Sequence, residues 1–245
     1  MTDTLVWITG ASAGIGAAVA ETVPFSGAHV FDVSRSGGTP GTTHVPADLA
    51  DPLSWAALDA HLAAQIGAFA GERLVFVHCA GTLDPMGFAE AVDAVAYRRN
   101  VLLNAAAPLA LGQAFLRAAA AFAGSAHLIL LSSGAATSPY PGWSSYCAGK
   151  AAVEMWVRTV GEEQRLRTGR GESAVTVLAV APGVVATAMQ EQIRAVPEEQ
   201  FPAVGKFLGL HARGELRDPV DAARSIWSLL DRDLESGSCV DLRNL

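Results

Sequence analysis

Two side chains spaced one helical turn apart give this sequence its clearest chemical signal. Tyr146 precedes Lys150 by four residues, and Ser133 lies thirteen residues before the tyrosine. Residues i and i+4 share a helix face, so the phenol and the ammonium can act as a pair. A free phenol titrates near ~10, and a neighbouring ammonium favours the phenolate and lowers its pKa. The hydroxyl of Ser133 could then hold a carbonyl oxygen beside the phenol. An ordinary helix face carries the same spacing, so the interpretation needs support from elsewhere.

A glycine-rich turn near the N-terminus provides that support. It follows an apolar run at 5–8 and precedes an alanine-rich segment at 17–21, which predicts a buried strand, a turn and a helix. Glycines at this point let the backbone approach a pyrophosphate, and the helix N-terminus offers N–H donors to it. The residues expected to contact a dinucleotide here are Gly10, Ser12, Gly14, Ile15 and Gly16. The alternative is a glycine-rich turn that binds nothing.

Together these residues resemble the short-chain dehydrogenase/reductase family, and the resemblance extends over essentially the whole chain. Within the family the sequence is similar to sepiapterin reductases and bacterial benzil reductases, through residues 142–152, 181–190 and 236–241. Such a resemblance implies an enzyme that moves a hydride between a nicotinamide cofactor and a carbonyl or alcohol carbon.

The resemblance also implies roles for individual residues. Ser133 is expected to polarise the substrate carbonyl, Tyr146 to protonate its oxygen, and Lys150 to hold the nicotinamide ribose. Asn100 matches the family residue that supports a water and proton relay to the lysine. An asparagine inside a long helix can also be a mildly unfavourable residue with no such role.

The order of apolar runs and helical patterns predicts an α/β fold. We expect a doubly wound, Rossmann-type parallel sheet of about seven strands with helices on both faces, in one domain over 1–245. The expected strands are 5–9, 29–34, 43–47, 73–79, 127–133, 175–181 and 238–242, and the main helices are 52–69, 88–122, 143–168 and 218–231. Residues 184–216 interrupt this alternation and are expected to form a lid over the substrate.

Composition excludes several other classes of protein. The chain has a net charge of −7, which disfavours non-specific binding to nucleic acids or anionic membranes. We find no apolar stretch of 18 or more residues and expect neither a membrane span nor a signal peptide. Three dispersed cysteines without a C-x-x-C pair favour a reducing cytoplasm and argue against a metal site.

The end of the second expected strand bears on the choice of cofactor. An acidic side chain there would bind the ribose 2′-hydroxyl of NAD, whereas an arginine accommodates the 2′-phosphate of NADP. Ser34 and Arg35 occupy this position, so we expect NADPH (NADP). Asp32 is a complication, but it lies two residues earlier, inside the strand. Arg35 could also be a solvated loop residue.

Further cofactor contacts are expected from loops at the ends of later strands. Asp48 matches the family residue that contacts the adenine, although it could be a turn residue. Thr187 matches the residue that contacts the nicotinamide carboxamide, although it could cap a helix. The other residues expected to line the cofactor site are Leu49, Ala80, Gly81, Pro182, Gly183 and Val185. His78 and Cys79 replace an Asn-Asn pair that is usual in the family.

The resemblance implies a substrate with two adjacent carbonyls, as in sepiapterin-like side chains or benzil. Trp143, Met189 and Asp241 are the expected substrate contacts besides Ser133 and Tyr146. By resemblance, Asp241 would anchor the guanidine-like edge of a pterin, although it could instead pair with Arg243. The alternatives are a hydroxysteroid or acyl-thioester dehydrogenase of the same family, or a non-catalytic NADPH-binding protein.

Alanine-rich helices suggest association with further copies of the chain. The expected helices at 88–122 and 143–168 carry small residues that let partner helices approach, and relatives commonly associate through these two helices. We therefore expect a homodimer or homotetramer. The alternative is that the same alanines pack on the chain's own sheet.

Overall fold

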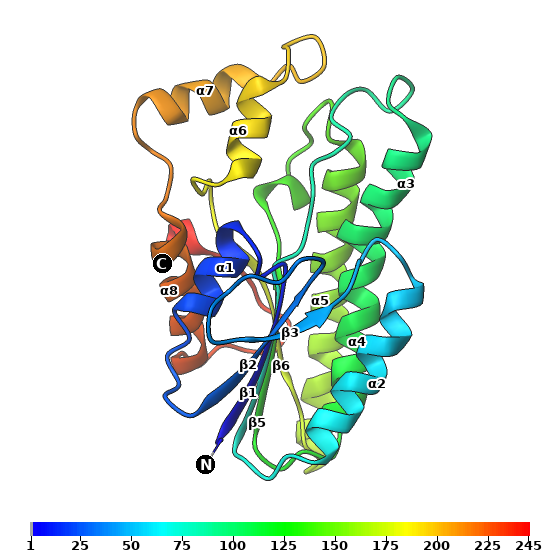
Figure 1. The fold of residues 1–245 in the computed structure, drawn as a ribbon, viewed down its shortest axis with the longest axis vertical. Coiled ribbons are helices and arrows are strands. Elements are labelled where there is room, and N and C mark those ends of the chain that lie inside the picture. Colours follow the sequence, from blue (N-terminus) through cyan, green and yellow to red (C-terminus); the bar gives the residue numbers. More distant parts are fainter. Residues whose placement is uncertain (1) are drawn as a thin grey trace.

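The computed structural model describes residues 2–245 and contains one parallel sheet of seven strands (Figure 1). The strands are β1 Thr4–Thr9, β2 Ala28–Ser34, β3 Thr43–Pro46, β4 Arg73–His78, β5 Ser125–Leu131, β6 Thr176–Ala181 and β7 Cys239–Asp241. Their order across the sheet is β3-β2-β1-β4-β5-β6-β7. Both the expected fold class and the expected strands are confirmed, with strand ends shifted by no more than two residues.

Burial on both faces explains why the strands are continuous apolar runs. Every residue of β1 is buried, and so is every residue of β4 after the first. On one face Trp7 stacks on Phe31, with 5.2 Å between ring centroids, and Phe115 of a covering helix meets the indole edge. Val6, Ile8 and their neighbours form a second core on the other face.

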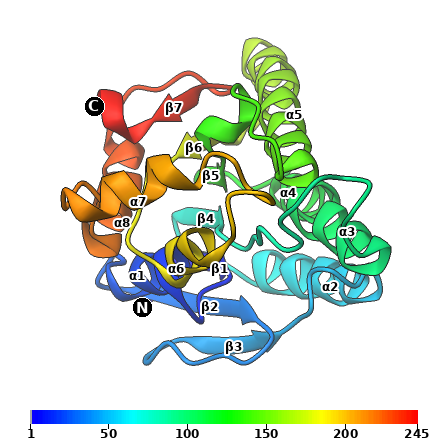
Figure 2. The ribbon, with the colours of Figure 1, turned by 90° about the horizontal axis from the view of Figure 1, so that it is seen from above.

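Helices cover the two faces of the sheet (Figure 2). The helices are α1 Gly14–Glu21, α2 Leu53–Gly67, α3 Ala94–Val101, α4 Ala107–Ala119, α5 Ser144–Gly169, α6 Ala188–Ala195, α7 Val204–Ala212 and α8 Pro219–Ser228. Helices α2, α4 and α5 pack on one face, and α1 and α8 pack on the other. At the start of α8, the Asp218 carboxylate accepts from the N–H groups of Val220 and Asp221, as expected of a helix cap.

The helix expected over 88–122 differs from the structure in two ways. It begins only at Ala94, because the Asp93 side chain accepts from Ala96 N at 2.8 Å and caps the helix there. It also contains a π-helical turn, Leu102–Ala106, between α3 and α4. By length and composition alone, the continuous segment Ala94–Ala119 could cross a membrane. In this fold its α4 part packs on the sheet, so its apolar residues serve the core.

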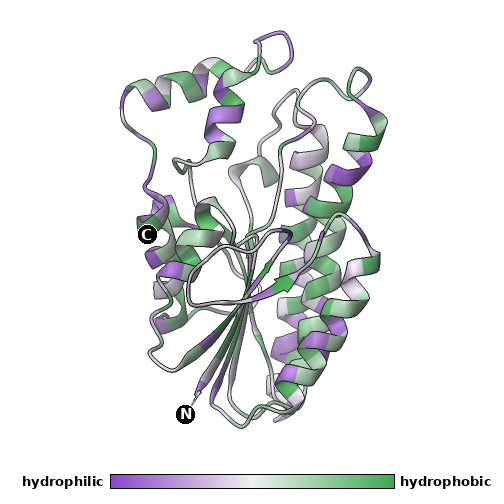
Figure 3. Cartoon of the chain, in the orientation of Figure 1, coloured by the Kyte–Doolittle hydropathy of each residue, from purple (hydrophilic) through white to green (hydrophobic). Residues whose placement is uncertain are grey.

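The segment 184–216 lies above the carboxyl edge of the sheet and contains α6 and α7 (Figures 1 and 2). Helix α7 is mostly apolar, with Lys206 and His211 as its polar side chains (Figure 3). Its Phe207 joins a third apolar cluster with Phe201, Trp143 and Tyr146. The rings of Trp143 and Phe201 stack with centroids 4.3 Å apart. The segment therefore covers the region around Tyr146.

Candidate active site

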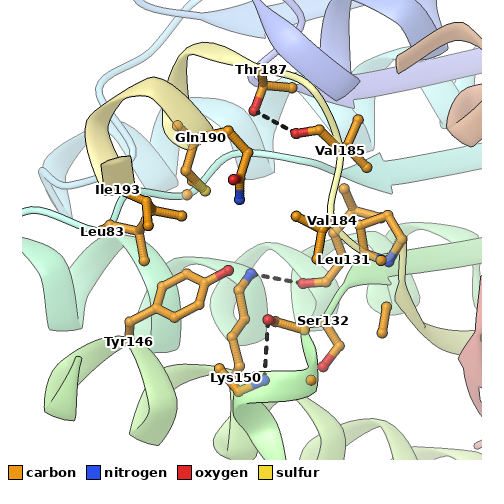
Figure 4. Close-up of a pocket in the computed structure, with 18 of the residues that line it drawn as sticks. Leu83, Leu131, Ser132, Tyr146, Lys150, Val184, Val185, Thr187, Gln190 and Ile193 are labelled. Atoms are coloured by element: carbon orange, nitrogen blue, oxygen red, sulfur yellow. Dashed lines mark hydrogen bonds between the residues drawn. The ribbon is translucent and has the colours of Figure 1, made fainter. Parts of the chain in front are cut away.

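The structure brings Tyr146 and Lys150 together on the buried face of α5. Their exposed fractions are 7% and 5%. Lys150 Nζ donates to the carbonyl oxygen of Leu131 at 2.8 Å and lies 5.6 Å from the centre of the Tyr146 ring. Figure 4 shows both polar ends directed to the same side of one cavity. The expected pair therefore exists as a geometric unit, held against the last residue of β5.

Ser133 follows β5 by two residues and lines the same cavity. Its hydroxyl accepts from Ala135 N at 3.2 Å, which fixes the turn after the strand. Ser132, the neighbouring candidate, also lines the cavity, but its hydroxyl donates to the buried carboxylate of Glu154 at 2.7 Å. Ser133 is therefore the serine whose hydroxyl can still donate to a ligand, in agreement with its expected position relative to Tyr146.

Burial governs the protonation of the pair. It raises the pKa of Tyr146 to about 12, and the adjacent Ser133 hydroxyl acts in the opposite direction. Burial lowers the pKa of Lys150 to about 8. We expected the ammonium to lower the pKa of the phenol, but in the free protein desolvation dominates and the phenol keeps its proton. A protonated phenol is ready to donate.

Asn100 and Asn104 form a hydrogen-bonded pair beneath the loop that follows β4. Asn100 Nδ2 donates to the carbonyls of Thr82 and Asp84, and its Oδ1 accepts from Asn104 Nδ2 at 2.8 Å. No hydrogen bond joins Asn100 to Lys150 within residues 2–245. Asn104 lies in the π-helical turn and packs on α5, because a Cβ added at Gly149 would lie 3.2 Å from the Asn104 carbonyl oxygen. Asn104 therefore contacts the helix that carries the pair.

A second cavity runs along the glycine-rich turn between β1 and α1. All five residues expected there line it: Gly10, Ser12, Gly14, Ile15 and Gly16. A Cβ on Gly16 would lie 2.2 Å from the carbonyl oxygen of Gly10, so only glycine permits this tight turn. The backbone is therefore open at the N-terminus of α1, where an anionic group can approach it.

The far end of this cavity carries the residues that follow β2. Ser34 and Arg35 line it, whereas Asp32 is fully buried and does not. Asp48 also lines the cavity, and its carboxylate accepts from Arg99 at 2.9 Å. Partial burial raises the pKa of Asp48, but hydrogen bonds from Arg99 and from Ala50 N outweigh this effect and lower it. The cavity thus carries exposed glycine backbone at one end and the Arg35 side chain at the other.

The remaining expected cofactor residues occupy the same region. Leu49, Ala80 and Gly81 line the second cavity, Pro182, Gly183 and Val185 line the first, and Thr187 lines both. Thr187 stands at the start of α6, but its hydroxyl makes no capping bond and instead approaches the carbonyl of Val185 at 3.4 Å. Cys79 lines both cavities, while His78 is buried beside Thr9, with its pKa lowered to about 3 by burial.

The cavity around Tyr146 is largely apolar and aromatic. Trp143 and Met189 line it as expected, and they are joined by Tyr140 and Phe207. Asp241 is not among its lining residues, because its carboxylate accepts two bonds from Arg243 Nε, at 2.9 and 3.1 Å. Arg243 lines the cavity in its place. The structure thus follows the alternative in which Asp241 pairs with Arg243.

Sequence reasoning missed several residues of the site. Gln190 and Lys206 of the lid, and Arg243 near the C-terminus, line the cavity around Tyr146. Asn104 supports it from the π-helical turn. Gln190 follows Met189 directly in a stretch that already carried the family resemblance, which was the available signal. The others carry no local pattern, because their position depends on how distant segments fold over the sheet.

Comparison with known proteins agrees with this geometry. The family model for short chain dehydrogenases matches residues 4–198. The chain belongs to the short-chain dehydrogenase/reductase family. It is an oxidoreductase that acts on CH–OH or C=O groups, and its family binds nicotinamide cofactors.

Similar proteins within the family include two named reductases. A benzil reductase ((S)-benzoin forming) from Bacillus subtilis is 30% identical over 239 residues, which cover 96% of this chain and 97% of that protein. The sepiapterin reductase of Rattus norvegicus is 33% identical over 181 residues, which cover 71% of this chain and 64% of that protein. The crystal structure of the KRED1-Pglu enzyme superposes with a TM-score of 0.79 at 28% identity, covering 97% of this chain and 100% of that one.

The burial of the Lys150 ammonium leads to a prediction about how the stability of the fold depends on pH. Lys150 titrates at about 8 in the folded chain against an ordinary 10.5, so between these values the unfolded chain binds the proton that the folded chain has lost. Stability should therefore rise with pH across this window. Between pH 7 and 9.5, the free energy of unfolding of the cofactor-free protein should rise by on the order of 2 kcal/mol more than that of Lys150→Met, as measured by urea unfolding.

Tyr146 and Cys79, whose pKa values burial also raises, are present in both proteins, so their contributions largely cancel in the difference. A difference between the two proteins that stays constant with pH would show that Lys150 titrates normally.

Proposed function

We propose that this protein is an NADPH-dependent carbonyl reductase whose substrates are α-dicarbonyl compounds, aromatic diketones such as benzil in particular. The observation that carries the proposal is the convergence of Ser133, Tyr146 and Lys150 on one aromatic cavity beside the dinucleotide cleft. The benzil reductase likeness over nearly the full length of both chains supports the substrate class.

Each polar side chain has a distinct part in the reduction. Bound NADPH supplies the hydride to the carbonyl carbon. The Ser133 hydroxyl donates to the carbonyl oxygen, and Tyr146 transfers its proton to that oxygen as negative charge develops there. Lys150 lies beside the phenol and stabilises the phenolate that results. Asn104, packed against α5, is assigned the relay position that we had expected for Asn100.

The protonation of the pair supports reduction as the working direction. With a pKa of about 12, Tyr146 carries its proton at neutral pH. An alkoxide is far more basic than a phenolate, so proton transfer from the phenol to a reduced carbonyl is downhill. Alcohol oxidation would instead require the phenolate, which burial disfavours in the free protein.

The surroundings of the cavity favour an aromatic diketone over a pterin. A pterin presents an N–H edge that a free carboxylate would bind, yet no carboxylate among residues 2–245 lines this cavity, and Asp241 is held by Arg243. Tyr140, Trp143 and Phe207 instead offer ring faces and edges. The two phenyl groups of benzil match such walls.

The arginine in the dinucleotide cleft supports NADPH as the cofactor. Arg35 is exposed in the second cavity, and no side-chain carboxylate within the described residues pairs with it there. A related protein of Beutenbergia cavernae, 27% identical over 98% of this chain with a TM-score of 0.75, holds NADP at low occupancy in its crystal structure.

Replacing the proton donor tests the proposed reaction. The purified protein should oxidise NADPH in the presence of benzil, followed by absorbance, and Tyr146→Phe should lower kcat by ~10²–10⁴-fold because only the transferable proton is lost. NADPH affinity, followed by fluorescence titration, should change by no more than a few-fold. Near wild-type turnover in the folded variant would overturn the assignment, and a wild-type protein inactive on every α-dicarbonyl would overturn the substrate class.

The choice of cofactor has its own test. Arg35→Ala should raise the KM for NADPH about 10–150-fold while that for NADH changes little, because a charge-assisted bond to the 2′-phosphate is removed. Arg98→Ala, a change at an exposed arginine outside both cavities, is the matched control. Equal effects of Arg35→Ala on the two cofactors would show that this arginine does not select between them.

We further propose that the chain is a homodimer or homotetramer that associates through α3, α4 and α5. Large apolar side chains are exposed along this side, with Val101 40%, Met155 60% and Leu166 62% exposed. Light scattering at micromolar concentration should give two or four times the chain mass of 25.4 kDa. Met155→Arg should lower that mass, whereas Leu208→Arg on the lid should not. A monomeric wild-type protein would contradict the proposal.

A further inference from the structure

One buried polar side chain of the substrate cavity has no role in the proposed mechanism. Gln190 is the third residue of α6 and only 7% exposed, and its side chain lines the cavity around Tyr146. Its backbone N–H donates to the carbonyl of Thr187, so the main chain is satisfied by the first turn of the helix. Its side-chain Oε1 is fully buried and has no hydrogen-bond partner among residues 2–245.

The direction of this side chain indicates what it can bind. Figure 4 shows the Gln190 amide extending from the lid into the cavity, toward the side where the Tyr146 hydroxyl lies. The Thr187 hydroxyl near its base is directed to the Val185 carbonyl instead. The amide nitrogen lies on the cavity side and makes no hydrogen bond among residues 2–245, so an oxygen atom of a bound ligand can be its partner.

We propose that Gln190 recognises the second oxygen of the substrate, the one on the carbon next to the carbonyl that is reduced. The inference rests on the proposed function, because it takes Tyr146 and Ser133 to hold the reacting carbonyl. The amide nitrogen donates, and the oxygen of a second carbonyl or of an adjacent hydroxyl can accept, so Gln190 can bind either group. The substrate class is therefore α-oxygenated ketones, both 1,2-diketones and α-hydroxy ketones.

This arrangement also explains how a simple ketone would be rejected. A ketone with a methylene in place of the second carbonyl fills the same space but leaves the Gln190 amide buried and unpaired. Sites built around such a polar group discriminate strongly against analogues that lack its partner. The aromatic walls contact the diketone and the simple ketone in the same way, so the discrimination between them comes from the Gln190 amide.

The experiment compares two ligands of nearly identical shape. Benzil and deoxybenzoin share two phenyl groups and one ketone, and differ by one carbonyl replaced with methylene. We would measure kcat/KM with NADPH for both substrates in the wild type and in Gln190→Met, which keeps the length of the side chain but removes its amide. Gln200→Met, at an exposed position of the same lid segment outside both cavities, is the matched control.

Gln190→Met should lower the benzil-to-deoxybenzoin ratio of kcat/KM about tenfold or more, by slowing benzil alone. The greater intrinsic reactivity of benzil affects this ratio equally in both proteins, so it cancels when the ratio of the variant is compared with that of the wild type. Activity on deoxybenzoin within about twofold of wild type shows in the same assay that the variant is folded and binds NADPH. Gln200→Met should leave the ratio unchanged.

Two results would overturn the inference. An unchanged ratio would show that Gln190 does not contact the second oxygen. An equal loss on both substrates with a raised KM for NADPH would assign the amide to the cofactor instead. Either result leaves the reductase assignment intact as long as the wild type reduces benzil, whereas a wild type that reduces no diketone refutes the proposed function itself.

Discussion

A lysine ammonium buried without a carboxylate partner is the feature on which the rest of this site depends. Lys150 is 5% exposed, and its only hydrogen bond among the described residues goes to the carbonyl of Leu131. Burying a charge this way is costly, and the lowered pKa of the ammonium reflects that cost. The single bond requires α5 to lie directly against the end of β5. Once it does, Tyr146 stands one turn earlier and Ser133 two residues beyond the strand.

Close packing on the other side of α5 makes this position possible. Gly149 leaves room for the π-helical turn, where Asn104 approaches the helix backbone. The Asn104 amide in turn bonds both the N–H and the carbonyl of Thr82, at 3.1 and 2.7 Å, in the loop after β4. One side chain thus ties the loop beside the cofactor cleft to the helix that carries the catalytic pair.

The fold and the centre of the site could be predicted from the sequence because their signals are local. Strands buried on both faces must be apolar throughout, and the Tyr146–Lys150 spacing is set by one helical turn. The π-helical turn could not be predicted, since residues 94–119 show helical character throughout and only tertiary packing selects the irregular turn. Asn100 and Asn104 lie one helical turn apart on that segment. The sequence therefore offered no means of deciding which of the two packs against Gly149 of α5.

The substrate side was harder to predict for a different physical reason. The pairing of Asp241 with Arg243 depends on a short strand at the sheet edge that leaves both side chains free to meet, and the resemblance alone could not exclude it. Lys206 and Gln190 belong to a lid whose position follows from the apolar cluster around Trp143 and Phe201. Contacts of this kind arise between segments more than forty residues apart, where no periodicity in the sequence reports them.

The segment 184–216 borders both cavities through the first turn of α6. Thr187 and Met189 line both cavities, and Gln190 follows them on the same turn of α6. Gly14 of the phosphate-binding turn lies against this point as well, since a Cβ added to it would be 3.3 Å from the methyl group of Thr187. The glycine-rich turn and the first turn of α6 therefore pack closely against each other where the two cavities meet. Gln190 follows Met189 directly on this turn, so the amide that we propose to bind the second substrate oxygen is held by the same helical turn that borders the proposed cofactor cleft.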